Sequence, residues 1–404
     1  MLTSVHVWHD LVQSLVRPLP ARHEPLADAE GCLLAGAVSA MHPLPPFDAS
    51  AMDGYALRAR DVSGAEPAHP VRLRVIASAP AGHPVGVVVG AGEAVRILTG
   101  GQLPVGADAV VAVEATDGGR QVVTVREAVG PGRHVRRAGE DLAQGAHVLQ
   151  PGRVVGPGQV AAAAAAGHDT VPVVPRPRVL IVSTGDELVA PGRPLAPSQL
   201  PDSNAAGLAA AVRLAGGQAT VLRCGDDPRM LRRLLTQHAT TADLVLTSGG
   251  ISAGEENDVV KAALTGGPVR FVNVAMQPGS PQAAGTVDGV PFIGLPGNPV
   301  SALVSFAVFV RPLLRRLRGL APEPAACPVE LAAPVVPHPV KTRYVAARWV
   351  ADGARSKAAP HPRQGSHLMT LLAESDLLLE IAPGEQPHAT GSLVPARRLY
   401  GDTS

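Results

Sequence analysis

Residues 178–187 read RVLIVSTGDE, and residues 243–254 read DLVLTSGGISAG. Each stretch is a strand-length run of apolar residues that ends in Ser and Thr and breaks at a glycine. Continuous apolar runs of this length are typical of strands that are buried on both faces. The two stretches therefore predict strands of a buried parallel sheet with polar loops at their carboxyl ends.

Strand-like and helical segments alternate from residue 177 to about residue 319. Asp227 and Asn298 each precede a proline, which places an N-cap side chain ahead of a proline at the first helical position. Alternation of this kind predicts a mostly parallel sheet with helices on both faces. Strands are expected at 178–184, 219–224, 243–248, 269–274 and 290–295, and helices at 204–215, 229–239, 258–264 and 299–318.

The remaining segments have other compositions. The length of 404 residues predicts about two to four domains, and the 43 Gly and 40 Pro predict many turns. Residues 1–45 lean toward helix, and six alanines within 160–167 predict one buried helix that ends at Gly167. Beyond Ala321 the chain is rich in Pro and β-branched residues, which predicts a small β barrel or sandwich. Residues 41–152 predict a small β-rich domain, with strand-like runs at 71–77, 86–89, 109–113 and 121–125.

Several classes of protein are disfavoured. The 35 Lys and Arg nearly balance the 34 Asp and Glu, so neither a polybasic nucleic-acid binder nor a membrane-surface protein is expected. No apolar run approaches ~18 residues and no signal-peptide core opens the chain, which predicts a soluble, unexported protein. Cys32, Cys224 and Cys327 lie far apart without C-x-x-C spacing, which fits a reducing cytoplasm. No lysine follows a glycine, so a Walker A phosphate loop is absent from the sequence.

Four strand ends carry unusual residues: 185–187, 225–227, 249–254 and 296–301. Ligands of a parallel sheet lie outside the carboxyl ends of its strands. The glycines let backbone N–H groups approach an anion, and the helix after Asn298 presents its positive end to the same edge. Carboxylates beside an anion make sense if a divalent cation lies between them. The pattern predicts a phosphate-bearing ligand held with Mg²⁺ or a similar ion.

Each loop also has a simpler interpretation. Residues 185–187 fit a turn with a solvated acidic face, and Asp227 fits a helix cap. Asp202, Ser203 and Asn204 fit the cap of the next helix, although their position at the sheet edge also permits a ligand contact.

Two short motifs have competing interpretations. Residues 156–161 (GPGQVA) fit the relaxed G-x-G-x-x-A pattern but lack a surrounding strand-turn-helix unit, so a turn is expected. Residues 250–254 (GISAG) match the G-x-S-x-G nucleophile elbow, with Ser252 as the nucleophile of a serine hydrolase. No HGGG-type segment precedes it, and the downstream histidines all lie in the C-terminal β segment, which makes this a distant alternative: His338, His361, His367 and His388.

Residues 44–56, LPPFDASAMDGYA, closely resemble the signature of the MoeA family of molybdopterin molybdenumtransferases, which includes the gephyrin E domain. The C-terminal segments 365–372 and 377–383 are similar to the barrel of that family. The resemblance covers nearly the whole chain, and its motifs are long and collinear. Further matching motifs follow at 94–100, 104–111, 136–141, 183–188, 226–228, 248–254 and 294–301.

The resemblance implies an α/β multidomain fold and a homodimer. Its active cleft would lie between the α/β domain of one subunit and the inserted domain of the other. The implied reaction inserts molybdate into adenylylated molybdopterin with release of AMP, in the cytoplasm and with Mg²⁺. A molybdopterin adenylyltransferase and molybdoenzymes are candidate protein partners. The implied parts are an elongated N-terminal domain (1–45 with 136–173), an inserted β-rich domain (46–135), a MoaB-like doubly wound α/β domain (174–321) and a C-terminal β barrel (322–404).

The resemblance also assigns residue roles. Asp53 and Thr99, with Gly100 beside them, would contribute from the inserted domain, although Asp53 also fits a turn with Gly54 and Thr99 a strand-end hydroxyl. Catalytic carboxylates would be Glu187, Asp226 and Asp258, and metal ligands Glu187, Asp226 and Asp227. The ligand would be bound by Asp186, Ser248, Gly249, Gly250, Ser252, Pro296, Gly297, Asn298, Pro299 and Ser301.

Two departures from the family pattern stand out. Gln277 and Ser280 occupy positions where the family often has lysine, so two positive charges that would attract molybdate are absent. Arg343 or Arg348 would replace that charge, although each also fits a surface arginine. The loop 254–261 is one residue longer than usual, which leaves Asn257 and Asp258 as alternatives for the acidic position. A MoeA-like binding or scaffold paralogue with weak turnover is the resulting alternative function.

Overall fold

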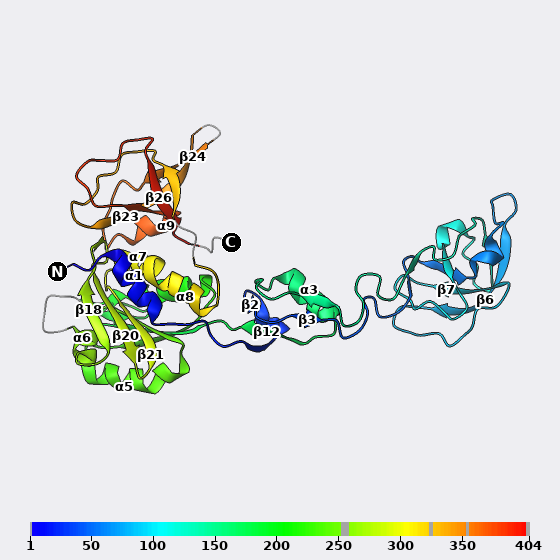
Figure 1. The fold of residues 1–404 in the computed structure, drawn as a ribbon, viewed down its shortest axis with the longest axis horizontal. Helices are drawn as coiled ribbons and strands as arrows, with labels where there is room; N and C mark the ends of the chain where they lie inside the picture. Colours follow the sequence, from blue (N-terminus) through cyan, green and yellow to red (C-terminus); the bar gives the residue numbers. More distant parts are fainter. Residues whose placement is uncertain (1, 252–257, 323–325, 353–354, 401–404) are drawn as a thin grey trace. The chain divides into compact units, whose positions relative to one another are not determined.

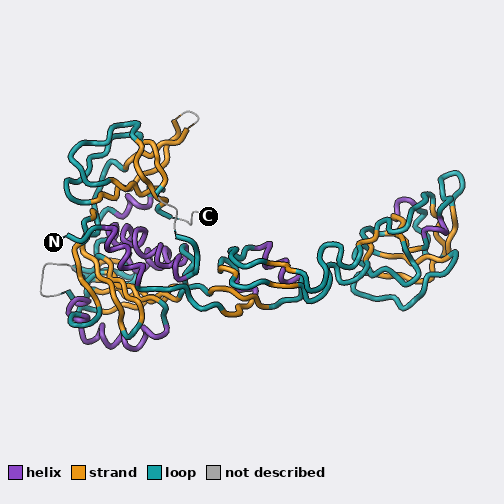
Figure 2. The backbone as a smooth tube through the Cα atoms, viewed as in Figure 1, coloured by secondary structure: helices purple, strands orange, loops and turns teal. Residues whose placement is uncertain are grey.

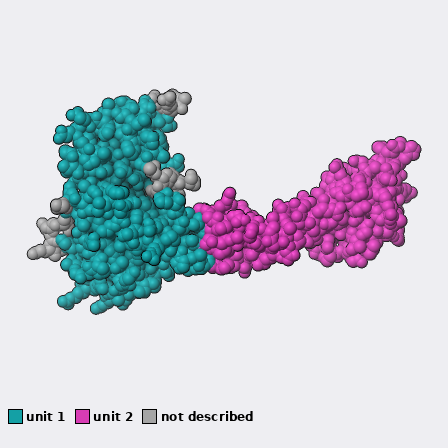
Figure 3. Space-filling view, viewed as in Figure 1, with its two compact units in different colours: residues 1–22, 31–33, 174–404 teal, residues 23–30, 34–173 magenta. Residues whose placement is uncertain are grey.

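The computed structural model describes residues 2–251, 258–322, 326–352 and 355–400. The chain divides into two compact units, shown in Figure 3. Unit 1 comprises Met1–Arg22, Gly31–Leu33 and Val174–Ser404, and unit 2 comprises His23–Glu30 and Leu34–Val173. In the described part of the chain, no helix combines the length and the apolar character that a membrane span requires.

The central sheet of unit 1 is mostly parallel, as the sequence predicts. Its strands lie in the order β16-β13-β17-β21-β20-β18. The first four strands are parallel, whereas β20 and β18 pair antiparallel. The strand bounds are β16 Gln218–Cys224, β13 Arg178–Thr184, β17 Leu244–Ser248, β21 Val290–Leu295, β20 Pro281–Val287 and β18 Val269–Asn273.

Strand β20 was not among the predicted strands, because its sequence PQAAGTV starts with proline and contains Gly285. A Cβ atom at Gly285 would lie 2.0 Å from the carbonyl oxygen of Pro268. The glycine therefore lets two backbones approach closely, and the strand depends on that tertiary contact rather than on local preference.

Helices cover both faces of this sheet (Figures 1 and 2). Alternate side chains of β13 belong to two separate hydrophobic cores. Ile181 packs with α4, α7 and α8, whereas Val182 packs with α5 and α6. The helix predicted at 299–318 is continuous but contains a π-helical segment, because Pro312 cannot donate a backbone hydrogen bond to the preceding turn. The bounds are α4 Ser203–Leu214, α5 Pro228–His238, η3 Ala239–Thr241, α6 Val259–Leu264, α7 Pro299–Ser305, η4 (the π segment) Phe306–Val310 and α8 Arg311–Leu317.

The N-terminal helix α1 (Val5–Ser14) belongs to the core of unit 1. Trp8 and Val12 are buried among residues of the π segment and α8. The Nε2 atom of Gln13 donates to the Phe309 carbonyl at 3.4 Å. The first helix of the chain is thus held by one of its last helices.

The C-terminal strands form the predicted barrel. Strand order is β19-β23-β25-β26-β22, and β24 pairs with β23. A bridge between Leu331 and Ala358 joins the chain after β22 to β24 and closes the sheet. The bounds are β19 Met276–Gln277, β22 Cys327–Glu330, β23 Thr342–Asp352, β24 Arg355–Pro360, α9 Met369–Ala373, β25 Leu377–Ile381 and β26 Leu393–Arg398, with the small pair β14 Leu188–Val189 and β15 Leu200–Pro201 beside the central sheet.

Unit 2 contains a five-stranded sheet of order β8-β5-β7-β6-β9. Three of the predicted runs are strands within two residues of their expected bounds. The run at 86–89 is not a strand and contributes only a single bridge, from Val88 to Val105. The bounds are β5 Gly54–Leu57, η1 Ala59–Val62, β6 Val71–Ala79, β7 Glu93–Ile97, β8 Ala109–Ala112, η2 Val113–Ala115 and β9 Val122–Val125.

Short elements make up the rest of the N-terminal half. Residues 15–45 are mostly loop, with three short strands and one four-residue helix, so the helical character expected for residues 1–45 holds only in part. The alanine run forms most of α3 and its C-cap, but within the run only Ala163 and Ala166 are buried. Gly156 and Pro157 begin that helix, and Gln159 Oε1 accepts from the Gly156 N–H, so the expected turn is also wrong. The bounds are β1 Arg22–Pro25, α2 Leu26–Ala29, β2 Leu33–Leu34, β3 Val38–Ser39, β4 Ala49–Ser50, β10 Val135–Arg136, β11 His147–Leu149, α3 Pro157–Ala165 and β12 Thr170–Val174.

Candidate functional site

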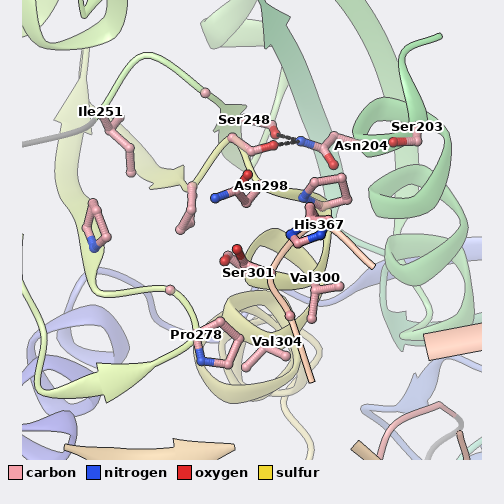
Figure 4. A pocket seen from close by; sticks show the side chains of 18 of the residues that line it. Ser203, Asn204, Ser248, Ile251, Pro278, Asn298, Val300, Ser301, Val304 and His367 are labelled. Atoms are coloured by element: carbon pink, nitrogen blue, oxygen red, sulfur yellow. Dashed lines mark hydrogen bonds between the residues drawn. The ribbon is translucent and has the colours of Figure 1, made fainter. Parts of the chain in front are cut away.

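A cavity of about 950 Å³ lies at the carboxyl ends of the parallel strands in unit 1 (Figure 4). Its volume is in the range of small-molecule binding sites. Loops after β13, β16, β17 and β21 line it together, as expected for this type of sheet. The predicted site residues that line it are Glu187, Asp226, Ser248, Gly249, Gly250, Asp258, Pro296, Gly297, Asn298, Pro299 and Ser301.

Two predicted acidic residues do not line the cavity. Asp227 Oδ1 accepts from the Arg229 N–H at 2.8 Å, so the helix-cap interpretation is correct and its assignment as a metal ligand has no geometric support. Asp186 Oδ1 accepts from the Asp226 N–H at 3.1 Å, and Asp226 Oδ2 accepts from the Asp186 N–H at 3.3 Å. These reciprocal bonds hold the loops after β13 and β16 together.

The turn after β17 requires its glycines. Gly249 has φ +92° and Gly250 has φ +65°, a region that side chains disfavour. A Cβ atom at Gly250 would lie 2.8 Å from Val259 Cγ1. The sequence predicts this turn from its glycines, and Ser252 and Asn257 of the following loop lie outside the described residues.

Asn204 joins three elements at the cavity edge. Its Nδ2 donates to Ser248 Oγ and to the Gly297 carbonyl, both at 2.7 Å (Figure 4). Asp202 caps α4 by accepting from the Ala205 N–H at 2.9 Å, and its other oxygen pairs with Arg223 Nε at 2.8 Å. The cap predicted for this helix is correct, and Asn204 additionally fixes the strand ends that form the cavity.

Asn298 does not cap α7 with its side chain, contrary to the prediction. The Val300 N–H instead donates to the Ser366 carbonyl at 3.0 Å, from a loop of the barrel. A remote segment therefore takes the place of the local cap, and the Asn298 amide lines the cavity instead (Figure 4).

The barrel supplies one wall of the cavity, which sequence reasoning largely missed. Gln277 and Arg343 pair in register between β19 and β23, and both line the cavity. Arg343 Nη1 donates to the Val336 carbonyl at 2.5 Å. Burial raises the pKa of the Tyr344 hydroxyl, so this residue stays neutral. Ser280 and Arg348 are not among the lining residues, and Ser280 Oγ donates to the Val274 carbonyl at 2.8 Å. The barrel residues lining the cavity also include Gln364, Gly365, Ser366 and His367.

Asp53, Thr99 and Gly100 belong to unit 2. Asp53 Oδ1 accepts from both the N–H and the Oγ1 hydroxyl of Thr99, each at 2.7 Å. These bonds, first that from the Thr99 backbone and then that from its hydroxyl, lower the pKa of Asp53 below its ordinary value. Gly100 has φ +79° and donates its N–H to the Ser50 carbonyl. Asp53 is therefore a fixed, ionised carboxylate on the surface of unit 2.

The lining carboxylates suit a hard cation. Within residues 2–251 and the later described ranges, no cluster of three or more His, Cys, Asp or Glu side chains has metal-binding geometry. Mg²⁺ is commonly held by one or two carboxylates, water and substrate phosphates rather than by an all-protein cage. Glu187, Asp226 and Asp258 provide oxygen ligands of that kind. Their chemistry fits a Mg²⁺ ion shared with a phosphate ligand.

Three family models match successive parts of the chain. They are described as the MoeA N-terminal region (domain I and II) at residues 3–167, a probable molybdopterin binding domain at 180–316, and the MoeA C-terminal region (domain IV) at 328–399.

Individual proteins of similar sequence or fold have names that refer to molybdopterin as well. Molybdopterin molybdenumtransferase 2 of Mycobacterium tuberculosis is 45% identical over 331 residues, which cover 80% of this chain and 81% of that protein. Molybdopterin molybdenumtransferase 1 of the same organism is 34% identical over 406 residues, covering 94% of each. The crystal structure of a molybdopterin biosynthesis MoeA protein from Pyrococcus horikoshii superposes with a TM-score of 0.76 at 30% identity, covering 99% of this chain and 100% of that one.

Proposed function

Since the chain belongs to the MoeA family, we propose that it is a molybdopterin molybdenumtransferase, which inserts molybdate into adenylylated molybdopterin and releases AMP. The observation that carries this proposal is the cavity of about 950 Å³ in which glycine turns and carboxylates meet at one edge of the sheet. A nucleotide phosphoanhydride needs both features, because its oxygens require neutralisation and its leaving group requires positioning.

The residues divide into two roles in this proposal. The Gly249 and Gly250 turn, with Ser248 and the segment from Pro296 to Ser301, would hold the phosphate and pterin groups. Glu187, Asp226 and Asp258 would orient water at the phosphoanhydride and hold Mg²⁺, with Asp186 bracing Asp226. When bound, the ion would neutralise charge on the phosphate oxygens.

The proposal includes a homodimer in the cytoplasm. Asp53, Thr99 and Gly100 of one copy would complete the site of a second copy, as the family resemblance implies. The fixed, ionised state of Asp53 supports such a role. The same resemblance supports a molybdopterin adenylyltransferase and molybdoenzymes as protein partners.

The test incubates purified protein with adenylylated molybdopterin, Mg²⁺ and molybdate, then measures AMP and the activation of a molybdenum-free molybdoenzyme. We expect molybdate-dependent AMP release, reduced at least about 100-fold by Glu187→Gln because this carboxylate lines the cavity. Glu385→Gln, at an exposed position of the barrel, is the matched control and should be unaffected. Absence of AMP release from the unaltered protein would reject the proposal.

One observation favours a binding or scaffold paralogue with weak turnover as the second candidate. Gln277 lines the cavity without charge, and Arg343 beside it already donates to a backbone carbonyl. Binding of adenylylated molybdopterin without AMP release would identify this candidate. Gln277→Lys should then raise AMP release, whereas Ser280→Lys should have little effect because Ser280 is outside the cavity lining.

A further inference from the structure

The loop 361–368 carries His367 from the barrel into the cavity of unit 1. Gln364 Nε2 donates to the His361 carbonyl at 2.8 Å, and the imidazole Nε2 of His361 contacts Glu374 Oε2 at 3.1 Å. The Ser366 carbonyl accepts from the Val300 N–H. The bond between Ser366 and Val300 places the neighbouring His367 beside the start of α7.

The His367 ring is available to a ligand. It is exposed, and neither ring nitrogen has a hydrogen-bond partner among the residues that the structure describes. Figure 4 shows the ring among the side chains that line the cavity, with Asn298 and Ser301. A Cβ atom at Gly365 would lie 3.4 Å from His367 Cε1 and 3.0 Å from Leu368 Cδ1. The glycine thus leaves the space that the ring occupies.

The cavity lining contains more acidic than basic side chains, so each group that can attract an anion matters for ligand binding. Glu187, Asp202, Asp226 and Asp258 contribute negative charge, and Asp202 also pairs with Arg223. Among the described lining residues, only Arg343 and His367 can carry positive charge. The Arg343 guanidinium donates to the Val336 carbonyl, so part of its donor capacity is already used.

We propose that the His367 imidazole is a substrate contact that donates a hydrogen bond to an oxyanion of the bound ligand, either a phosphate oxygen or molybdate. This proposal rests on the proposed function and deepens it. The charged side chains that line the cavity together with His367 are Glu187, Asp202, Asp226, Asp258 and Arg343.

The experiment titrates the full-length protein by calorimetry, with AMP plus Mg²⁺ in one arm and molybdate in the other. We expect His367→Leu to weaken binding about tenfold, because leucine cannot donate a hydrogen bond. His367→Lys keeps a donor and should retain binding. The arm that responds identifies the oxyanion. The control is His238→Leu, because His238 is exposed at the end of α5.

A second measurement needs no variant. Diethylpyrocarbonate acylates accessible imidazoles, and peptide mass analysis should show that the ligand protects His367 but not His238. Equal affinities of the unaltered protein and His367→Leu, or absence of protection, would overturn the inference while leaving the proposed function intact. Failure of the unaltered protein to bind either ligand would instead reject the proposed function and this inference with it.

Discussion

Two hydrogen bonds determine the charge state of Asp53, an exposed residue among the predicted catalytic groups. Asp53 keeps its charge to lower pH than an ordinary aspartate because Thr99 donates to it from both its backbone and its hydroxyl. Thr99→Val removes only the hydroxyl bond, so the pKa of Asp53 should rise part of the way to its ordinary value. If the Asp53 carboxylate acts in AMP release, the acid limb of the pH–rate profile should move to higher pH.

Thr99→Ser is the matched control, since serine keeps the donor and should preserve the acid limb of the unaltered protein. Identical acid limbs for Thr99→Val and the unaltered protein would show that Asp53 is not the group that titrates in that limb.

Residues whose bonds are local were predictable, and residues placed by remote segments were not. The Asp227 cap follows from an aspartate before a proline, and the bond it makes spans two residues. Asn298 has the same arrangement, yet its capping bond is absent because Ser366 from the barrel accepts the Val300 N–H. The place of His367 in the cavity lining had no local sequence signal, since it depends on the barrel loop.

At the scale of elements, the turn after β17 has no room for a side chain at Gly250. Gly250→Ala adds a Cβ that would lie 2.8 Å from Val259 Cγ1, in addition to the unfavourable φ of +65°. We expect the free energy of unfolding to fall by about 2–4 kcal/mol. The control is Gly266→Ala. Its added Cβ, at φ +85°, meets no atom within 4 Å, so the free energy of unfolding should fall by only about 1 kcal/mol.

Denaturant unfolding followed by tryptophan fluorescence compares the two variants, because Trp8 and Trp349 both lie in unit 1. Equal losses would show that the turn moves to accommodate the methyl group.

The strands and helices that pack by regular apolar patterns were predicted within a few residues. This holds for β13 and α5, where the apolar run or the helical spacing is uninterrupted. Strand β20 was missed because a glycine disfavours a strand locally, whereas here Gly285 permits a close contact between two backbones. A strand was wrongly predicted at 86–89, because high β propensity does not by itself provide a neighbouring strand for pairing.

At the scale of the whole molecule, the proposed homodimer makes a quantitative prediction. If Asp53 of one copy completes the site that contains Glu187 of the other, Asp53→Asn and Glu187→Gln proteins should each be inactive alone. After the two proteins are mixed and their subunits exchanged, heterodimers contain one intact site, so AMP release should recover to about a quarter of the normal rate. No recovery despite confirmed subunit exchange, measured with differently tagged copies, would show that both residues act within one subunit.

The α/β fold, the barrel and the family were predictable from the sequence, because each is encoded in contiguous motifs. The division into four domains at 45, 135, 173 and 321 stays a prediction. The partition into two compact units was not predictable, since it depends on where α1 packs.

The position of α1 has a consequence for biosynthesis. Gln13 contacts Phe309, which is 296 positions away, so the first helix leaves the ribosome long before its packing partner. At a synthesis rate of about 5–20 residues per second, the apolar face of Trp8 and Val12 would wait roughly 15–60 s for that partner. The nascent chain is therefore expected to need shielding of its N-terminal segment during translation, and the α/β core to mature only after most of the protein has been made.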